Sequence, residues 1–381
     1  MERRTFLRAG LAGFGVAGLS ATPLAGTVHS RALARIFDPR HRYDGPVRLS
    51  SNENPLGLSP SAREAIVAGL DEANRYPGAT GDAVYEALAA HLGVPRDHLF
   101  LGAGSTETLR VSVQAWAGPG ARLIYAQPTF EDVPGYSQPF PFEHVAIPLT
   151  RNHEHDIGRM REVADRGSGP TIVYICNPNN PTGGITPTRP IEAWMREAGE
   201  QTLFLIDEAY YEFVDDPGYR SAISFVSEMP NVIVVRTFSK IYAMAGIRLG
   251  YGIAHPKTVD RARPFTTRNN PNHLAGVAAI ASLEDPDLVG RSVSVNLEAR
   301  AITHAVLDEL GIERLPSQTN FLMHGIRGDL ATYNNRMLEA GFSVGRPFPP
   351  MTSYSRLSMG MPDDMARFAD TLRTFRQKSW I

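Results

Sequence analysis

The amino-acid sequence predicts an α/β fold, with a large domain built on a mostly parallel sheet and a smaller domain beside it. The main observation is a series of short apolar runs separated by helical patterns, at 98–101, 122–125, 171–175, 203–206 and 232–235. Near-continuous apolar strands are typical of parallel sheets, because crossover helices cover both faces of such a sheet. A length of 381 residues allows one large core and a smaller one.

Helical signals place the remaining elements in order. Ser59 and Pro60 predict the start of a helix that ends near Leu70, with Ser59 as N-cap and Pro60 in the first helical position. After Asp285-Pro286-Asp287 a long helical pattern covers 293–310, and shorter segments follow. We expect residues 78–285 to form the large domain. Residues 31–77 and 286–381 are expected to form the smaller α/β domain from both ends of the chain.

Composition excludes several classes of partner and site. The formal net charge of −2 gives no electrostatic reason to expect nucleic acid or an anionic membrane surface as a partner. A hydrophobic content of 43% and a charged content of 20% are ordinary for a soluble globular protein. Because Cys176 is the one cysteine, the chain has no intramolecular disulfide and no cysteine-based zinc site, and we predict no metal.

The first residues resemble a twin-arginine export signal. Arg3 and Arg4 stand just before Phe6-Leu7, and apolar sequence rich in Gly and Ala continues to about Ala25. The segment is too weakly apolar for a membrane span, which needs about 20 predominantly apolar residues. We therefore predict a signal peptide over 1–30 and a periplasmic mature protein without a membrane segment. The alternative is a frayed N-terminal helix and a cytoplasmic protein.

Chemically informative residues follow four of the predicted strands. These segments are Gly102-Ala103-Gly104-Ser105-Thr106, Asn177-Pro178-Asn179-Asn180-Pro181-Thr182-Gly183, Asp207-Glu208-Ala209-Tyr210, and Thr237-Phe238-Ser239-Lys240 with Arg248 shortly after. Ligands of open α/β sheets bind at the carboxyl ends of the strands. Each segment alone has a structural explanation, such as a glycine turn, a helix N-cap at Asp207 or a surface lysine. Their joint occurrence predicts one site.

The chemistry of these residue types indicates a Schiff base beside a bound phosphate. Glycines and a helix start present free N–H groups to an anion. A lysine such as Lys240, placed at a buried strand end near a cation, has a lowered pKa and can act as a nucleophilic amine. Two prolines keep the asparagine-rich segment irregular, so that it can present a side chain rigidly.

With these motifs the chain resembles the class I/II pyridoxal-phosphate-dependent aminotransferases of fold type I, and within them the histidinol-phosphate aminotransferase branch. The resemblance covers about 49–360 and is strongest in Asn179–Gly183, Asp207–Tyr210 and Ser239-Lys240. It implies a seven-stranded, mostly parallel sheet and pyridoxal 5'-phosphate as cofactor. It is much less specific for the substrate.

By this resemblance, Lys240 forms the internal aldimine and moves the proton from the substrate α-carbon. Asp207 pairs with the pyridine nitrogen, because a positive charge there makes the ring an electron sink. Asn180 and Tyr210 bind the ring oxygen O3′. The phosphate is held by backbone N–H groups, hydroxyls and a guanidinium, contributed by Ser105, Thr106, Thr237, Ser239 and Arg248.

The resemblance also assigns residues outside the four strand ends. Phe130 stacks on the pyridine ring, unless it is simply a core residue. Tyr76 reaches the cofactor phosphate of a neighbouring subunit, which implies a homodimer; the alternative is local packing. Arg356 binds the anionic end of the substrate, and Asn54 belongs to the segment that closes over it.

The reaction that follows is a ping-pong transfer of an amino group between an amino acid, or an amino phosphate, and a 2-oxo acid. The nearest resemblance implies histidinol phosphate as substrate, whereas an export signal favours another amino donor. The alternatives are a decarboxylase, lyase or racemase of the same fold, which would share every cofactor residue, and a non-catalytic cofactor-binding protein.

Overall fold

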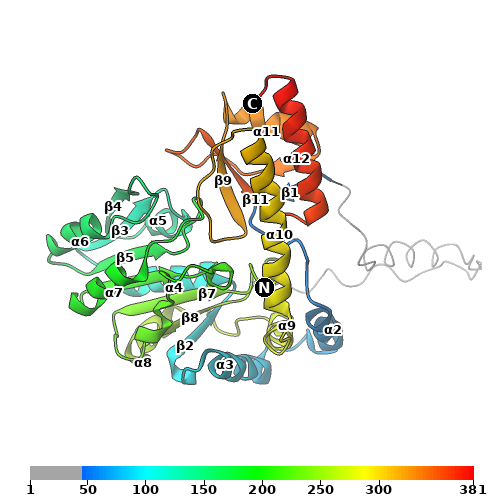
Figure 1. Ribbon diagram of the computed structural model, residues 1–381. Coiled ribbons are helices and arrows are strands. Elements are labelled where there is room, and N and C mark those ends of the chain that lie inside the picture. The colour runs from blue at the N-terminus through cyan, green and yellow to red at the C-terminus, as the bar shows by residue number, and fades with distance from the viewer. Residues whose placement is uncertain (1–44) are drawn as a thin grey trace, which may run out of the picture. The chain divides into compact units, whose positions relative to one another are not determined.

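The computed structural model describes residues 45–381, and residues 46–381 form one compact unit. The predicted export signal, with Arg3 and Arg4, lies outside the described residues. Figure 1 shows a large sheet surrounded by helices, with the C-terminal helices and two small sheets to one side of it.

The large sheet has seven strands in the order β2-β8-β7-β6-β5-β3-β4. β8 runs antiparallel to both of its neighbours, and the other strand pairs are parallel. The predicted α/β class with a mostly parallel sheet is confirmed. The apolar runs identified five of these strands, whereas β4 and β8 were missed. The strands are β2 (Leu99–Gly102), β3 (Ala121–Gln127), β4 (Phe142–Pro148), β5 (Thr171–Cys176), β6 (Thr202–Asp207), β7 (Val232–Thr237) and β8 (Gly250–Ala254).

Helices cover both faces of this sheet, and each face has its own apolar core. Alternate residues of β5 illustrate the division, since Val173 and Ile175 belong to one core and Ile172 and Tyr174 to the other. Both sets are fully buried, which explains the uninterrupted apolar runs. The helices are α2 (Pro60–Gly69), α3 (Gly78–Leu92), α4 (Ser105–Trp116), α5 (Asp132–Ser137), α6 (Ile157–Asp165), α7 (Thr188–Glu197), α8 (Pro256–Ala262) and α9 (His273–Leu283).

A third core forms beside the large sheet. It packs two small sheets, β1-β10 and β11-β9, against three helices, and β1 places Leu49 in it. α10 runs from beside α9 to this part and packs against α12 (Figure 1). The elements are β1 (Val47–Leu49), β9 (Phe321–Gly325), β10 (Phe342–Val344), β11 (Tyr354–Ser358), α10 (Leu288–Glu309), α11 (Leu330–Glu339) and α12 (Pro362–Gln377).

The N-terminal stretch contributes to two of these cores. β1 joins the third core, but α2 packs against α9, and its Ala62 is buried in a core of the large sheet. Ser59 caps α2 as predicted, accepting a hydrogen bond from the Ala62 N–H at 3.1 Å. The domain limits at 77 and 285 stay a prediction. Within residues 45–381, no helix combines the length and the apolar character that crossing a membrane requires.

Candidate active site

The predicted strand ends meet at one cavity of about 310 Å³. Cys176, Asp207 and Thr237 end three adjacent strands, β5, β6 and β7, and all three line it. Residues from the side of the third core close the cavity, among them Arg356 of β11 and Phe348. Its lining comprises Ser51, Asn52, Ser105, Thr106, Thr129, Phe130, Glu131, Cys176, Asn180, Asp207, Ala209, Tyr210, Thr237, Ser239, Lys240, Ala245, Arg248, Arg346, Phe348 and Arg356.

One end of the cavity is built for an anion. α4 begins at Ser105, so the first N–H groups of this helix have no intrahelical partner and attract negative charge. Arg248 lies beside them, with its Nη1 3.3 Å from the Ser239 hydroxyl and its Nη2 3.2 Å from the Ala103 carbonyl. A Cβ atom on Gly104, whose φ is +79°, would stand 2.1 Å from Arg248 Nη2. Glycine at this position therefore lets the turn and the guanidinium approach each other.

Lys240 follows β7 and is partly buried at the cavity wall. Its Nζ donates to the backbone carbonyls of Asn52 at 3.2 Å and Ser51 at 3.4 Å. Burial, with the positive charges of Arg356 and Arg248, lowers the pKa of Lys240 to about 8. A substantial fraction of this amine is therefore neutral, and nucleophilic, at slightly alkaline pH.

Asp207 is a buried carboxylate at the end of β6, with a side chain held from two directions. Tyr174 Oη donates to its Oδ2 at 3.0 Å, and the Ala209 N–H donates to its Oδ1 at 3.1 Å. Burial raises the pKa of Asp207 to about 6, while these two hydrogen bonds and Lys240 oppose the shift. Asp207 is therefore mostly ionised at neutral pH and can stabilise a cation in the cavity.

Arg356 supplies a buried cation opposite these groups. Its Nη1 donates to Asn180 Oδ1 at 2.7 Å and its Nη2 to the Ser50 carbonyl at 2.6 Å. The Nε is itself buried and has no partner among the described residues, and each Nη nitrogen keeps a second N–H for a ligand. Burial lowers the pKa of Arg356 to about 10, which leaves it charged at neutral pH. This group can therefore bind an anionic ligand by a charge-assisted hydrogen bond.

The structure brings nearly all predicted site residues to this cavity. Two predicted residues lie elsewhere. Asn54 is turned away, with its Nδ2 bonded to the Ile241 carbonyl at 2.8 Å and the Ser292 hydroxyl at 2.9 Å. Its neighbour Asn52 lines the cavity instead and donates to Tyr210 Oη at 3.1 Å. Tyr76 is 82% exposed, away from the cavity of its own chain.

Sequence reasoning missed several lining residues, among them Ser51, Asn52, Thr129, Glu131, Cys176, Arg346 and Phe348. Glu131 adjoins the predicted Phe130, and Asn52 stands two residues before the predicted Asn54, so a wider search around each motif would have found both. Arg346 and Phe348 lie in an irregular segment after β10, and their residue types alone do not indicate a site.

These residues fit pyridoxal 5'-phosphate. An anion site of helix N–H groups, hydroxyls and Arg248 suits the phosphate. Ionised Asp207 suits a protonated ring nitrogen, and the amine of Lys240 suits the aldehyde. Three observations support this fit: the types of hydrogen-bond donor in the cavity, the close approach of the Arg248 guanidinium to Gly104, and the burial of Asp207.

Comparison with known proteins agrees with this fit. Residues 44–372 match the family model of class I and II aminotransferases. Histidinol-phosphate aminotransferase 1 of Nitrosococcus oceani is 36% identical over 96% of this chain and 96% of its own length. An aromatic amino acid aminotransferase of Thermobifida fusca is 34% identical over 90% of this chain and 95% of its own.

A solved structure extends the comparison to the cofactor. Histidinol-phosphate aminotransferase of Sinorhizobium meliloti, in complex with pyridoxal-5'-phosphate, superposes with a TM-score of 0.80 at 26% identity, covering 94% of this chain and 99% of that one. The chain therefore belongs to the class I and II aminotransferases and is a pyridoxal-phosphate-dependent, histidinol-phosphate aminotransferase-like enzyme.

Proposed function

We propose that Lys240 is the catalytic base of this aminotransferase and that Arg356 binds the anionic end of the amino donor. The observation that carries the proposal is the position of the Lys240 amine, in one cavity with ionised Asp207 and the guanidinium of Arg356. The bound cofactor supplies a ring that accepts the electron pair left on a deprotonated α-carbon.

The residues of this chain have separate tasks in that reaction. Arg356 orients the donor by its carboxylate or phosphate, so that the α-carbon faces Lys240. The Lys240 Nζ takes the α-proton, and its lowered pKa suits a base at slightly alkaline pH. Asp207 keeps a negative charge at the buried end of the cavity. Thr237, Ser239 and Arg248 hold the phosphate end in place.

An assay with several donors tests the reaction class. The purified holoenzyme is offered amino acids and histidinol phosphate, with 2-oxoglutarate or pyruvate as acceptor. Formation of a new amino acid from the acceptor supports transamination. Release of CO₂ or loss of α-stereochemistry without amino transfer would indicate the decarboxylase or racemase alternative. A bound cofactor that no donor perturbs would indicate a non-catalytic protein.

We further propose that the active enzyme is a homodimer in which Tyr76 serves the neighbouring subunit. Apolar side chains are exposed along the N-terminal stretch, with Val67 60%, Leu70 53% and Tyr76 82% accessible. Val67 and Leu70 lie three residues apart and therefore share a face. A second copy would cover this surface.

Light scattering should give about twice the chain mass of 41.7 kDa. The double variant Val67→Asp/Leu70→Asp should lower that mass toward one chain and weaken cofactor retention. Leu338→Asp, at a comparably exposed apolar residue on α11, is the control. A wild-type protein of single mass with full activity would refute the dimer.

We also propose that the chain is exported to the periplasm by its N-terminal segment, on the basis of Arg3 and Arg4 before an apolar stretch. Fractionation of cells that express the full chain should find the protein in the periplasm. Changing Arg3 and Arg4 to Lys should retain it in the cytoplasm. If that variant has the same location as the wild type, the twin-arginine assignment fails.

A further inference from the structure

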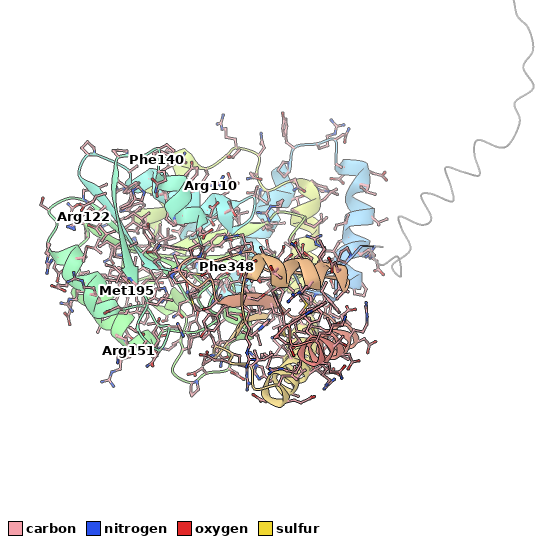
Figure 2. All side chains as sticks on the ribbon, turned by 90° about the horizontal axis from the view of Figure 1, so that it is seen from above. Arg110, Arg122, Phe140, Arg151, Met195 and Phe348 are labelled. Carbon is pink, nitrogen blue, oxygen red and sulfur yellow. The ribbon has the colours of Figure 1, made fainter. Side chains whose placement is uncertain are left out.

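A second arginine stands at the mouth of the cavity. Arg346 follows β10 and lines the same cavity as Arg356. Both guanidinium groups contact the buried ring of Phe348, with the Arg346 Cζ 4.2 Å and the Arg356 Cζ 4.5 Å from the ring centroid. Figure 2 labels Phe348 near the middle of the described part of the chain. Two cations against one aromatic ring would form a strong site for a doubly charged anion.

Glu131 forms an ion pair with this second arginine. It follows Phe130 in the segment between β3 and α5, and its carboxylate forms an ion pair with Arg346. The Arg346 Nη2 bonds to Oε2, and the Nη1 lies 3.5 Å from Oε1. The pair links a segment of the large sheet to one that follows β10, across the cavity mouth. Arg346 is therefore neutralised by a carboxylate, whereas the protein partners of Arg356 are a neutral amide and a backbone carbonyl.

The charge balance at this end of the cavity favours a single negative charge in the ligand. Arg356 contributes one positive charge, and the Glu131–Arg346 pair contributes none. A ligand with a second carboxylate, or a phosphate dianion, meets the negative charge of Glu131 or must break the ion pair. Phe348 also lines the cavity and adds an apolar surface there, which suits an uncharged side chain.

We propose that Glu131 is a specificity-determining residue that neutralises Arg346, so that the enzyme favours amino acids with one carboxylate and an uncharged side chain over dicarboxylic and phosphorylated donors. This proposal rests on the proposed function for the location of the substrate. It assigns a role to the ion pair that neither the cofactor nor the proton transfer requires.

The variant Glu131→Gln tests it by binding and by rate. Side chains at the mouth are about half exposed, with Arg346 at 55% and Glu131 at 54%, so the expected effect is moderate. Calorimetry of the holoenzyme with two unreactive acids, succinate and 3-phenylpropionate, measures the charge preference directly. Glu131→Gln should lower the dissociation constant of succinate by roughly five- to tenfold and change that of 3-phenylpropionate by less than about twofold. The ratio of kcat/KM for glutamate to that for phenylalanine should rise by a similar factor.

Two further variants make the result specific. Arg346→Gln, added to Glu131→Gln, should cancel the gain for succinate, because the freed cation is then removed. Glu309→Gln breaks a comparably exposed ion pair with Arg373 outside the cavity. It should leave the dissociation constants of both acids unchanged. The proposal is overturned if Glu131→Gln leaves the ratio of the two dissociation constants unchanged, or if Glu309→Gln alters it equally. Since binding is measured without turnover, a failure of the transaminase proposal itself would appear separately, as inactivity toward every donor.

Discussion

Lys240→Ala should slow amino transfer by a factor of about 10⁴ or more, because under the proposed function it removes both the amine that would bind the cofactor covalently and the base that would move the α-proton. The variant should also lack the visible absorbance of the lysine-bound cofactor. The chain has three lysines, and Lys257, exposed at the start of α8, provides a matched control. Lys257→Ala should retain both the absorbance and the activity. Full activity in Lys240→Ala would refute the assignment of the base.

Because the pKa of Lys240 is lowered, the rate at which the cofactor attaches to this lysine should depend on pH. Covalent attachment needs the neutral amine, and a pKa of about 8 means that the neutral fraction rises with pH up to that value. Attachment of the cofactor to the apoenzyme should therefore speed up about tenfold per pH unit below pH 8 and level off above it. Stopped-flow absorbance measures this rate. A rate that is independent of pH between 6 and 9 would show that Lys240 does not titrate there.

The strand ends could be predicted from sequence because each carries its chemistry within a few residues of a recognisable apolar run. Lys240 comes shortly after the apolar run of β7, and Asp207 directly follows the apolar run of β6. Both patterns are local, so they can be recognised without knowledge of the fold. β8 was missed because Gly250 and Gly252 read as a turn. In the structure the ring of Phe100 packs where a side chain at 252 would be, at 2.2 Å from its Cβ position. β4 was missed because Pro141 precedes it and Glu143 and His144 interrupt its apolar pattern.

The mouth of the cavity could not be predicted in the same way. Glu131 and Arg346 are 215 residues apart, and although Glu131 adjoins the predicted Phe130, no local pattern indicates that these two side chains pair. Asn54 was assigned to the substrate because its segment matches the family, but it bonds to Ile241 and Ser292. Asn52, which the backbone turns inward with a φ of +55°, reaches Tyr210. Whether Asn52 or Asn54 faces the cavity depends on the local direction of the backbone, which the sequence pattern alone does not specify.

Stability should depend strongly on a buried ion pair next to Asp207 in the sequence. Arg236 of β7 and Glu208, the residue after Asp207, have side chains only 6% and 1% exposed. Glu208 accepts hydrogen bonds from Arg236 Nη2 at 2.9 Å, the Ser221 hydroxyl at 2.7 Å and the Ala222 N–H at 2.8 Å. The Arg236 guanidinium also lies 3.8 Å from the ring centroid of Tyr211. The opposite charges of Arg236 and Glu208 therefore compensate each other inside the protein.

Arg236→Met should lower the free energy of unfolding by about 3–5 kcal/mol, because Glu208 then remains buried without a counter-charge. Arg373→Met breaks an ion pair whose side chains are 42% and 48% exposed, and it should cost no more than about 1 kcal/mol. Urea unfolding of the three proteins, followed by fluorescence and circular dichroism together, measures the difference. The double variant Arg236→Met/Glu208→Gln should recover part of the loss, since the stranded charge is gone. If Arg236→Met costs no more than Arg373→Met, the buried pair contributes no more to stability than an exposed one, and the argument from its burial fails.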